Sequence, residues 1–560
     1  MIYIDPPYNS DKDFVYKDDF KDNLANYQRL TGQKDEEGNP LFTNSDSTGR
    51  YHSNWLNMMY PRLKLARNLL KDDGVIFIHI SKQEISNVTK ICDEIFGEAN
   101  SLGVAIWDKG NPKGDSNSLA YQHEHIVIYA KNYERFKESN SFVRKKKNAK
   151  KMLSKAKVLF KNVGKKIARS EVKQCIKKLE LDINPNSYSL EYTLDDANND
   201  YQAWLKSQNF SNGEKAYCFI DEDGEVFQPV SMSWPNKKKA PAEYFIPLIH
   251  PLTKKECPVP EKGWRNPPET MKKLLELNLI IFGEDELKQP RRKYLLRENM
   301  DENIPSILYF GGSDDNLFSE WSFDFENPKP YLFAKDLIDS ASYDGDIVLD
   351  FFSGSATTAH ALMQLNAEDG GNRKFILVQI PEPTPENSEA RKAGYATIAE
   401  IGKERIRRAA KKIKEEHPDT QADLGFKVLK LDTSNIKKWN PNLDTLEADL
   451  LDAVDNILPD RTPEDLLYEV LIKYGLPLTL PIEKIQVGNH QAFNVAFGSL
   501  IACFDENITL ETVQAICDLS TPENPVLRVV FRDTSFTDDI TKTNAIQRLK
   551  QAGIEDVMSI

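Results

Sequence analysis

The sequence is poor in cysteine and has no long apolar segment. Its six cysteines are widely spaced among 560 residues and form no Cys-x-x-Cys pair, so neither a disulfide framework nor a zinc site is indicated. No run approaches the roughly 18 to 20 consecutive apolar residues that a membrane-spanning helix needs. Residues 1–5 also lack the basic and apolar segments with which a signal peptide begins. We therefore expect a cytoplasmic protein that has reduced thiols and is not bound to a membrane.

The composition is that of a globular chain. Hydrophobic residues make up 40%, charged residues 28% and aromatic residues 10% of the sequence, which excludes an intrinsically disordered protein. At roughly 100 to 200 residues per domain, this length predicts about three to four domains.

Charge is divided into blocks, so the net charge of −13 is a misleading average. Residues 144–178 hold 15 lysines or arginines and one acid, a net of +14. Residues 441–560 hold 20 acids and 8 bases, a net of −12. The acidic average argues against a nucleic-acid-binding protein, but the basic block is suited to phosphate contact. Such segregation predicts different partners for different parts of the chain.

Two parts of the chain have the pattern of an α/β fold. Residues 75–80 form a nearly continuous apolar run after a turn, as in a buried parallel strand. Before it, the apolar spacing predicts a helix over 62–70, with Pro61 in its first turn. Strand-like and helix-like stretches alternate again at 347–349, 357–365, 375–380 and 396–416. This alternation predicts a doubly wound sheet.

The tetrapeptide Asp5-Pro6-Pro7-Tyr8 follows a short apolar stretch. Its two prolines fix the backbone and lack N–H groups, so the carbonyl groups beside them are left as acceptors. A carboxylate before the prolines and an aromatic ring after them form a slot that accepts hydrogen bonds and stacks a flat group. The pattern indicates a site for a base with an exocyclic amine, and an ordinary turn after a strand is the alternative.

Residues 350–358, Asp-Phe-Phe-Ser-Gly-Ser-Ala-Thr-Thr, follow a predicted strand and open a predicted helix. Small residues at such a turn let backbone N–H groups and the positive end of the helix approach an anionic group. The aromatic side chain can contact a planar ring. A strand-to-helix turn without a ligand has the same pattern, so this motif by itself is weak evidence.

Together, and in this order, the two motifs resemble the β-class amino-methyltransferases of DNA. In that family an Asp-Pro-Pro-Tyr catalytic motif precedes a Phe-x-Gly cofactor motif, and a target-recognition region separates the two. The chain is similar, more closely still, to the modification (Mod) subunit of type III restriction-modification systems. Further stretches that support the resemblance are 49–63, 121–126, 327–330 and 531–533.

The resemblance implies that Asp5 and the Pro6 carbonyl accept hydrogen bonds from the amine of the target base, with Pro7 helping to fix the turn. Tyr8 is expected to stack on the base once it leaves the duplex, which returns about 1–3 kcal/mol of the cost of flipping. Aspartate at the first position resembles the adenine-N6 enzymes, since cytosine-N4 enzymes more often have serine there. We therefore expect a site-specific DNA methyltransferase that modifies N6 of adenine and needs no metal.

The resemblance also implies a binding site for S-adenosyl-L-methionine. The matching residues are Asp350, Phe352, Ser353 and Gly354, with Lys329 and Pro330 from the preceding loop. Gln379 stands where many methyltransferases have an acid for the ribose hydroxyls, and its amide can also bond a diol. Ala356 replaces the second glycine of the usual pattern. It fits if its φ is negative, and otherwise it strains the turn.

The basic block is the expected DNA-contact region. Phosphate contacts position a protein without reading sequence, and a solvated helix face is the alternative. The lysines that we assign to DNA are Lys145, Lys146, Lys147, Lys150 and Lys151. His123 and His125 are expected to be structural because no third metal ligand accompanies them, and His360 is expected to be structural as well.

The predicted architecture is a doubly wound, Rossmann-like α/β methyltransferase sheet, circularly permuted, with an inserted target-recognition domain and a mixed α/β C-terminal domain. The expected parts are the catalytic half (1–140), the target-recognition region (141–300), the S-adenosylmethionine-binding half (301–425) and an association domain (426–560). The expected partners are double-stranded DNA, the restriction (Res) ATPase/helicase subunit and a second copy of the chain as a homodimer.

The catalytic motif begins at residue 5, whereas the family usually has a long segment ahead of this strand. The chain is therefore expected to lack that N-terminal segment. This leaves a non-catalytic DNA-recognition subunit of a restriction complex as one alternative function. A cytosine-N4 methyltransferase is another, less favoured by the motif.

Overall fold

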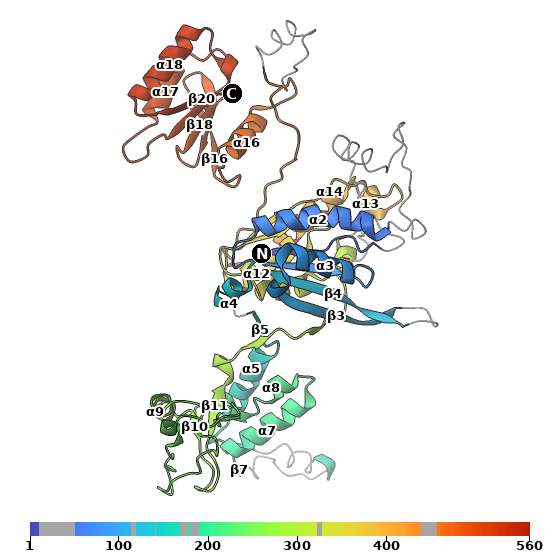
Figure 1. Ribbon diagram of the computed structural model, residues 1–560, viewed down its shortest axis with the longest axis vertical. Helices are drawn as coiled ribbons and strands as arrows, with labels where there is room; N and C mark the ends of the chain where they lie inside the picture. Colours follow the sequence, from blue (N-terminus) through green and yellow to red (C-terminus); the bar gives the residue numbers. More distant parts are fainter. Residues whose placement is uncertain are drawn as a thin grey trace. The chain divides into compact units, whose positions relative to one another are not determined.

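The computed structural model describes residues 1–9, 51–113, 119–139, 142–167, 177–179, 190–321, 328–437 and 456–560. These residues form two compact units, Met1–Leu424 and Gly425–Ile560 (Figure 1). Some residues named above lie outside the described ranges: 49–50, Asn327, and 168–176 of the basic block.

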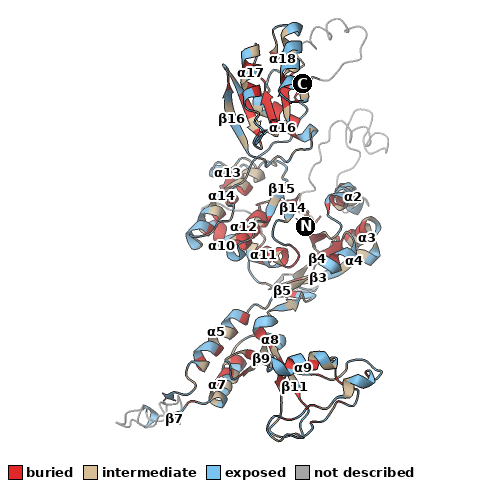
Figure 2. Ribbon diagram, turned by 90° about the vertical axis from the view of Figure 1, so that its left-hand side faces the viewer, coloured by how far each residue is buried: buried red, intermediate tan, exposed pale blue. Residues whose placement is uncertain are grey.

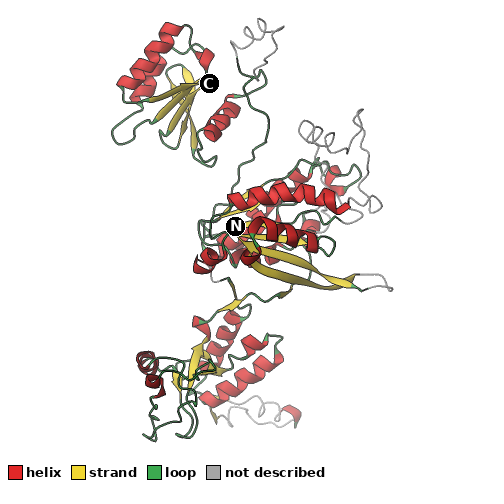
Figure 3. Cartoon of the chain, in the orientation of Figure 1, coloured by secondary structure: helices red, strands yellow, loops and turns green. Residues whose placement is uncertain are grey.

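A seven-stranded sheet forms the centre of the first unit (Figure 3). From edge to edge its strands are β13 (Ile307–Tyr309), β3 (Ser101–Lys113), β4 (Tyr121–Ala130), β2 (Val75–Ile80), β1 (Ile2–Ile4), β14 (Ile347–Asp350) and β15 (Lys374–Leu377). Neighbouring strands pair in parallel, except that β4 is antiparallel to both β2 and β3. The doubly wound α/β fold predicted from the sequence is confirmed.

Helices cover both faces of this sheet. Alternate residues of β1 point to opposite faces, so Ile2 and Ile4 pack in the cluster that contains α2 and α3, while Tyr3 packs with α11 and α12. The helices on the sheet are α2 (Tyr51–Leu69), α3 (Ile85–Phe96), α4 (Tyr133–Ser139), α11 (Tyr331–Asp339) and α12 (Thr357–Asp369). Nine consecutive residues of α12, 358–366, are buried (Figure 2). Helix α14 (Ile398–Glu416) packs against α12.

The prediction that a helix begins at Pro61 is wrong. Helix α2 starts at Tyr51, so Pro61 lies inside it. An interior proline removes a helical hydrogen bond and costs about 3 kcal/mol. The apolar stripe of α2 outweighs this cost, because Trp55 and Met59 are fully buried on the near side of the proline and Leu63 on the far side.

Between β5 (Val143–Lys145) and β12 (Asp301–Asn303) the chain forms smaller sheets of its own. β5 and β12 pair antiparallel, so the intervening segment leaves and returns at one place. Its strands are β6 (Lys166–Ile167), β7 (Leu190–Glu191), β8 (Phe219–Ile220), β9 (Val226–Ser231), β10 (Ile280–Ile281) and β11 (Arg291–Leu295). Its helices are α5 (Ala149–Phe160), α7 (Leu194–Ser207), α8 (Asn212–Lys215) and α9 (Pro268–Glu276). Two separate apolar clusters hold this segment together.

The second unit is a five-stranded sheet with helices on both faces. The strands are β16 (Ile482–Val487), β17 (His490–Val495), β18 (Leu500–Cys503), β19 (Arg528–Phe531) and β20 (Asp556–Ser559). The helices are α16 (Pro463–Lys473), α17 (Leu510–Asp518) and α18 (Asp539–Gln551). Helices α17 and α18 pack in one apolar cluster and α16 in another. This agrees with the predicted mixed α/β composition of the C-terminal part.

Two further short α-helices of the first unit are α10 (Asp315–Glu320) and α13 (Glu389–Lys392). Across the described ranges, no helix is long and apolar enough to cross a membrane. The five cysteines within these ranges are all free thiols.

Helix α2 offers a matched pair of leucines that tests the packing of the sheet face. Leu63 is fully buried and Leu65, one half-turn away, is 64% exposed. We expect Leu63→Ala to lower the free energy of unfolding of the first unit by about 2–5 kcal/mol, since it leaves a cavity. Leu65→Ala should change it by less than about 0.5 kcal/mol.

Urea unfolding followed by tryptophan fluorescence measures this difference, because six of the seven tryptophans lie within residues 1–424. Equal effects of the two substitutions would contradict the orientation of α2 on the sheet.

Candidate functional site

The two motifs lie side by side at the carboxyl ends of two inner strands of the large sheet. Asp5 follows β1 and Asp350 ends β14, and these strands are parallel neighbours with Ile2 opposite Leu349. From β1 the chain continues through α2 to β2 on one side, and from β14 it continues through α12 to β15 on the other. The boundary between β1 and β14 is therefore a topological switch point, where open α/β sheets bind their ligands.

Three charged side chains and a tyrosine form a compact group with Asp5. The Lys329 ammonium lies 3.6 Å from Asp5 Oδ2 and 2.7 Å from Glu124 Oε2. The Tyr8 hydroxyl donates to Glu124 Oε2 at 2.9 Å and accepts a hydrogen bond from Lys329. Lys109 donates to the other oxygen of Glu124. We call these five residues the Asp5 cluster.

Opposite charges balance within the Asp5 cluster. Burial favours the neutral form of Glu124, but Lys329 and Lys109 outweigh it and lower the pKa of Glu124 to about 2. Burial also opposes the charge of Lys329, and the two carboxylates nevertheless raise its pKa. For Asp5 burial dominates, so its pKa is raised although Lys329 opposes the shift. Glu124 is thus the firmly ionised carboxylate and Asp5 the more basic one.

One oxygen of Asp5 is available to a ligand. Asp5 Oδ1 is buried and has no hydrogen-bond partner among the described residues. An unpaired buried acceptor costs about 1–3 kcal/mol, so it is suited to receive a donor such as an exocyclic amine. The side chain as a whole is 31% exposed, so the other atoms of Asp5 lie near the surface.

Contacts from α2 and from the N-terminus of α3 fix the turn after β1. The indole N–H of Trp55 donates to the Pro7 carbonyl at 2.8 Å. Asn9 has a positive φ of 56° and donates from Nδ2 to Glu84 Oε1 at 2.6 Å. Glu84 is fully buried and also contacts His52 and Asn87. The Pro7 carbonyl is therefore hydrogen-bonded within the protein, whereas the carbonyl that the resemblance assigns to the target amine is that of Pro6.

Asp350 is held at the end of β14 by two donors. Thr358 Oγ1 donates to its Oδ2 at 2.6 Å, and the Phe352 N–H donates to its Oδ1 at 3.0 Å. Burial outweighs these hydrogen bonds and raises the pKa of Asp350 to about 7. Gln379 follows β15 and accepts from the Gly354 N–H at 2.7 Å through Oε1, so it joins the turn to the neighbouring strand.

The turn between β14 and α12 has two residues in the left-handed region. Gly354 has a φ of 48° and Ala356 a φ of 65°. The φ of Ala356 is positive and not negative, so this alanine strains the turn, at a cost of roughly 1–2 kcal/mol. Gly402 of α14 lies against this turn, and a Cβ added to it would come 3.3 Å from the Gly354 carbonyl oxygen. A side chain there would displace the turn.

Arg405 of α14, which is fully buried, joins three segments around this turn. Its Nη1 donates to Ser355 Oγ and to Thr357 Oγ1, both at 2.9 Å. Its Nη2 donates to Asp314, which also accepts from the Tyr331 N–H at 3.0 Å. No local pattern in the sequence marks this residue, since Arg405 is one of many charged residues in a helix.

The remaining predicted cofactor residues are divided between two groups. Phe352 and Ser353 are buried in the turn, and Pro330 is the N-cap of α11. Lys329 is adjacent to Pro330 in sequence, but its ammonium contacts Asp5, Tyr8 and Glu124. The structure therefore brings Lys329 together with the predicted catalytic residues.

The three histidines expected to be structural differ in their surroundings. His123 and His125 have their ring centroids 5.1 Å apart on β4. His360 is buried and stacks on Tyr331 with a centroid distance of 3.8 Å. Among the described residues no group of three or more His, Cys, Asp or Glu side chains could hold a metal ion.

The five lysines assigned to DNA lie on β5, the following turn and α5. Lys145 is paired with Asp301, and Lys146 donates to the carbonyls of Asn299 and Asp301. Lys147, Lys150 and Lys151 are exposed. Lys146 thus has a role in joining β5 to β12, and the other four side chains have more exposed positions.

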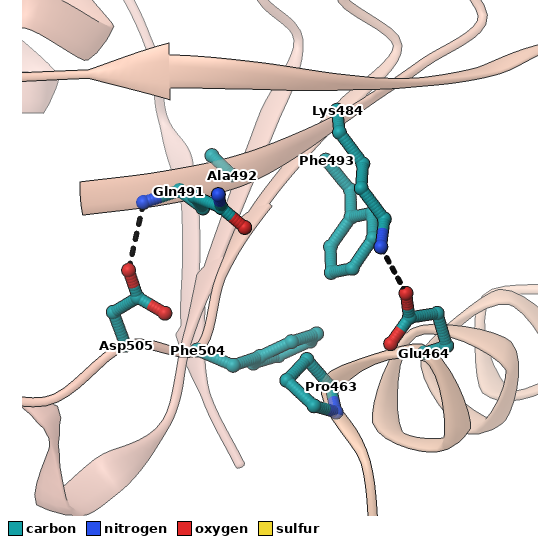
Figure 4. Close-up of a pocket in the computed structure, with 8 residues that line it drawn as sticks. All are labelled: Pro463, Glu464, Lys484, Gln491, Ala492, Phe493, Phe504 and Asp505. Atoms are coloured by element: carbon teal, nitrogen blue, oxygen red, sulfur yellow. Dashed lines mark hydrogen bonds and ion pairs between the residues drawn. The ribbon is translucent and has the colours of Figure 1, made fainter.

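The second unit contains a small pocket lined by Pro463, Glu464, Lys484, Gln491, Ala492, Phe493, Phe504 and Asp505 (Figure 4). Lys484 pairs with Glu464, and the Gln491 N–H donates to Asp505 at 2.7 Å. None of the predicted site residues lines this pocket.

The doubly wound sheet, with both motifs at its topological switch point, is the framework of a ligand-binding α/β protein. The chain belongs to the DNA methylase family, which it matches over residues 1–411. It is 34% identical over 546 residues to the Mod subunit of the type III restriction-modification enzyme EcoP15I of Escherichia coli, covering 96% of this chain and 77% of that protein.

Two further relatives cover less of the chain. Identity is 30% over 508 residues to the EcoPI Mod subunit of Escherichia phage P1, covering 88% of this chain and 70% of that protein. It is 25% over 409 residues to the type II methyltransferase M.KpnI of Klebsiella pneumoniae, covering 72% and 80%.

S-adenosylmethionine is the methyl donor of this family, and the residues at the switch point fit it. The donor carries a sulfonium cation, and Asp350 and Asp5 supply carboxyl groups at the ends of two adjacent strands. Gly402 lets the turn that contains Phe352 and Gly354 pack closely on α14. Within the described part of the chain, no donor contacts Asp5 Oδ1. When bound, the cofactor supplies the electrophilic methyl group.

We call the turn between β14 and α12, residues 350–356, the cofactor turn, because the sequence predicts that it binds S-adenosylmethionine. Arg405 should be needed for the shape of this turn. Arg405→Lys loses the fork that reaches Ser355, Thr357 and Asp314 together. We expect a loss of about 1–3 kcal/mol in stability and about tenfold weaker binding of S-adenosylmethionine. Thermal unfolding and calorimetric titration of the cofactor measure the two effects.

Arg407→Lys is the matched control, because Arg407 lies on the same helix with a side chain that is 56% exposed. An Arg405→Lys variant that binds the cofactor as well as Arg407→Lys does would contradict the role assigned to Arg405.

The raised pKa of Asp350 predicts a pH-dependent stability. The folded protein holds this proton up to about pH 7, whereas the unfolded chain releases it near pH 4. Burial of Asp350 therefore destabilises the fold increasingly as the pH rises from about 4 to 7. Asp350→Asn should gain stability over the parent protein from pH 5 to pH 8, by about 1–4 kcal/mol.

Urea unfolding at the two pH values tests this. Asp346→Asn is the control, because the hydrogen bonds and Lys71 that surround Asp346 outweigh burial and lower its pKa. Its effect should be the same at pH 5 and pH 8. A constant Asp350→Asn effect would show that Asp350 is ionised throughout this range.

Proposed function

We propose that this chain is a site-specific DNA methyltransferase that transfers a methyl group from S-adenosylmethionine to N6 of adenine. The observation that carries the proposal is the placement of Asp5 Oδ1 at the switch point, beside the turn of residues 350–356. This atom is a buried acceptor that has no partner among the residues that the structure describes. The similarity to type III Mod subunits over nearly the whole chain supports the same reaction.

Asp5 and the Pro6 carbonyl are proposed to accept hydrogen bonds from the adenine amine. The amine is a weak nucleophile because its lone pair is delocalised into the ring, and acceptors for its hydrogens draw that lone pair back to nitrogen. The raised pKa of Asp5 also makes it the better proton acceptor of the two carboxylates in the Asp5 cluster. Aspartate at this position is the feature that favours adenine over cytosine.

Tyr8 is proposed to stack on the target base after it leaves the duplex. Its hydroxyl is fixed by Glu124 and Lys329, so the ring is held in one orientation before the base arrives. A ring that is already ordered loses little entropy on binding. The neighbouring residues Asp350, Phe352, Ser353, Gly354, Pro330 and Gln379 are proposed to hold the cofactor, and Lys329 to serve both groups.

The partners are proposed from the relatives. Type III Mod subunits are named as parts of restriction-modification enzymes, and we propose that this chain likewise associates with a restriction ATPase subunit in the cytoplasm and forms a homodimer. The basic segment, with Lys145, Lys147, Lys150 and Lys151, is proposed to contact DNA phosphates within the target-recognition region (141–300). Residues 426–560 are proposed to form the association domain.

The reaction is tested by incubating the protein with plasmid DNA and labelled S-adenosylmethionine and then sequencing the DNA for modified bases. We expect N6-methyladenine within one asymmetric sequence. Asp5→Ala should lower the rate by about 10²–10³-fold, the effect of removing one group that acts on the reacting atoms. Tyr8→Ala should lower it by about 5- to 150-fold, the equivalent of one lost stacking contact of 1–3 kcal/mol.

Asp72→Asn and Tyr343→Ala serve as controls, since both side chains are exposed in the same unit and should leave the rate unchanged. DNA free of methylated adenine after incubation with folded protein would refute the proposed reaction. Full activity of both Asp5→Ala and Tyr8→Ala would refute the proposed residues.

A further inference from the structure

Glu124 stands in the centre of the Asp5 cluster. It belongs to the stretch 121–126 that supports the resemblance, but it lies outside the two motifs and was given no role there. It lies on β4 opposite Trp107 of β3, with a side chain that is 14% exposed. Both of its oxygens are used: Oε2 by Lys329 and Tyr8, and Oε1 by Lys109. Glu124 therefore joins the turn after β1, the loop before α11 and the strand β3.

The position of Lys329 between the two carboxylates is asymmetric. Its ammonium is 2.7 Å from Glu124 Oε2 and 3.6 Å from Asp5 Oδ2, so it is hydrogen-bonded to the first and not to the second. It also lies 4.6 Å from the centroid of the Tyr8 ring. An ammonium that moved onto Asp5 Oδ2 would lower the basicity of the carboxylate, which would make Oδ1 a weaker acceptor for an incoming amine.

We infer that Glu124 is a positioning residue that holds Lys329 away from Asp5 and fixes Tyr8, so that the Asp5 carboxylate stays open to the target amine. This inference rests on the proposed function. The two carboxylates of the Asp5 cluster then have different roles. Asp5 receives the substrate, whereas Glu124 binds the protein's own cations.

A balance of charges explains why both carboxylates are needed. With Glu124 ionised, two ammonium groups and two carboxylates share the cluster, and each buried charge has an opposite neighbour. Removing the charge of Glu124 leaves Asp5 as the one remaining carboxylate in contact with Lys329 within the cluster. Lys329 should then close on Asp5 Oδ2 and weaken Oδ1 as an acceptor for the amine.

Variants of Glu124 and Lys329 test this inference through their coupling. Glu124→Gln should lower the rate of methyl transfer, because Lys329 then binds Asp5 Oδ2 and lowers the basicity of the carboxylate. Adding Lys329→Met removes that cation, so the double variant should be faster than Glu124→Gln by roughly 2- to 100-fold, the range expected for coupled neighbours. Glu134→Gln, at an exposed position of α4, is the matched control and should leave the rate unchanged.

The pH profile gives a readout that a purely structural role would not change. The titratable groups around Asp5 are Lys329, Glu124, Tyr8, Lys109, Tyr3 and Asp350. Lys329 lowers the pKa of Asp5, so Lys329→Met should move the acid limb of the rate to higher pH. Glu124→Gln, in which Lys329 lies closer, should move it to lower pH.

A crystal structure of the Glu124→Gln variant without DNA tests the same inference independently of activity. The Lys329 Nζ to Asp5 Oδ2 distance should shorten from 3.6 Å to about 2.8 Å, the length of a charge-assisted hydrogen bond. An unchanged distance, or a double variant no faster than Glu124→Gln, would overturn the inference. A parent protein that does not methylate DNA would refute the proposed function, whereas the shortened distance would still support the arrangement of charges.

Discussion

The parallel pairing of β1 with β14 is the interaction on which the proposed site depends. Ile2 lies opposite Leu349, the Leu349 N–H donates to the Met1 carbonyl, and the Met1 amino group donates to the Ile347 carbonyl. These bonds join parts of the chain that are nearly 350 residues apart. Because two neighbouring parallel strands have their carboxyl ends on the same side of the sheet, this register sets Asp5 beside Asp350. Neither motif forms a site without the other.

The second constraint is the burial of charge at that edge. Asp5, Glu124, Lys329 and Lys109 are removed from much of their water, and each is offset by an opposite charge in contact. Arg405 and Asp314 form a similar buried pair behind the cofactor turn. Such pairs fix the positions of loops that the sheet alone does not hold. They connect the geometry of the fold to the chemistry proposed for it.

The sequence was sufficient to predict the sheet and the two motifs, because apolar runs such as 75–80 and local signatures such as Asp5-Pro6-Pro7-Tyr8 are read from adjacent residues. It did not predict the start of α2, since the burial of Trp55 and Met59 outweighs the local effect of Pro61. It also did not single out Glu124 or Arg405. Their partners lie far away in sequence, so only the folded chain shows that these charges are enclosed.

The same limit applies to the residues of the motifs themselves. Lys329 was grouped with the cofactor residues because it precedes Pro330, but its ammonium contacts Tyr8 and Glu124. Lys146 was grouped with the DNA-contact lysines because it lies in a basic run, and it bonds the backbone of 299 and 301. In both cases the sequence indicated that a lysine binds oxygen atoms, but it did not show which oxygen atoms those are.

We propose that the ends of β1 and β14 form one site, in which the methyl donor lies between Asp5 and Asp350. A crystal structure of the protein with S-adenosylmethionine would decide this. We expect the cofactor to bind against the turn of residues 350–356, with its methyl group directed at the Asp5 carboxylate. A cofactor bound elsewhere, or with its methyl group turned away from Asp5, would contradict it.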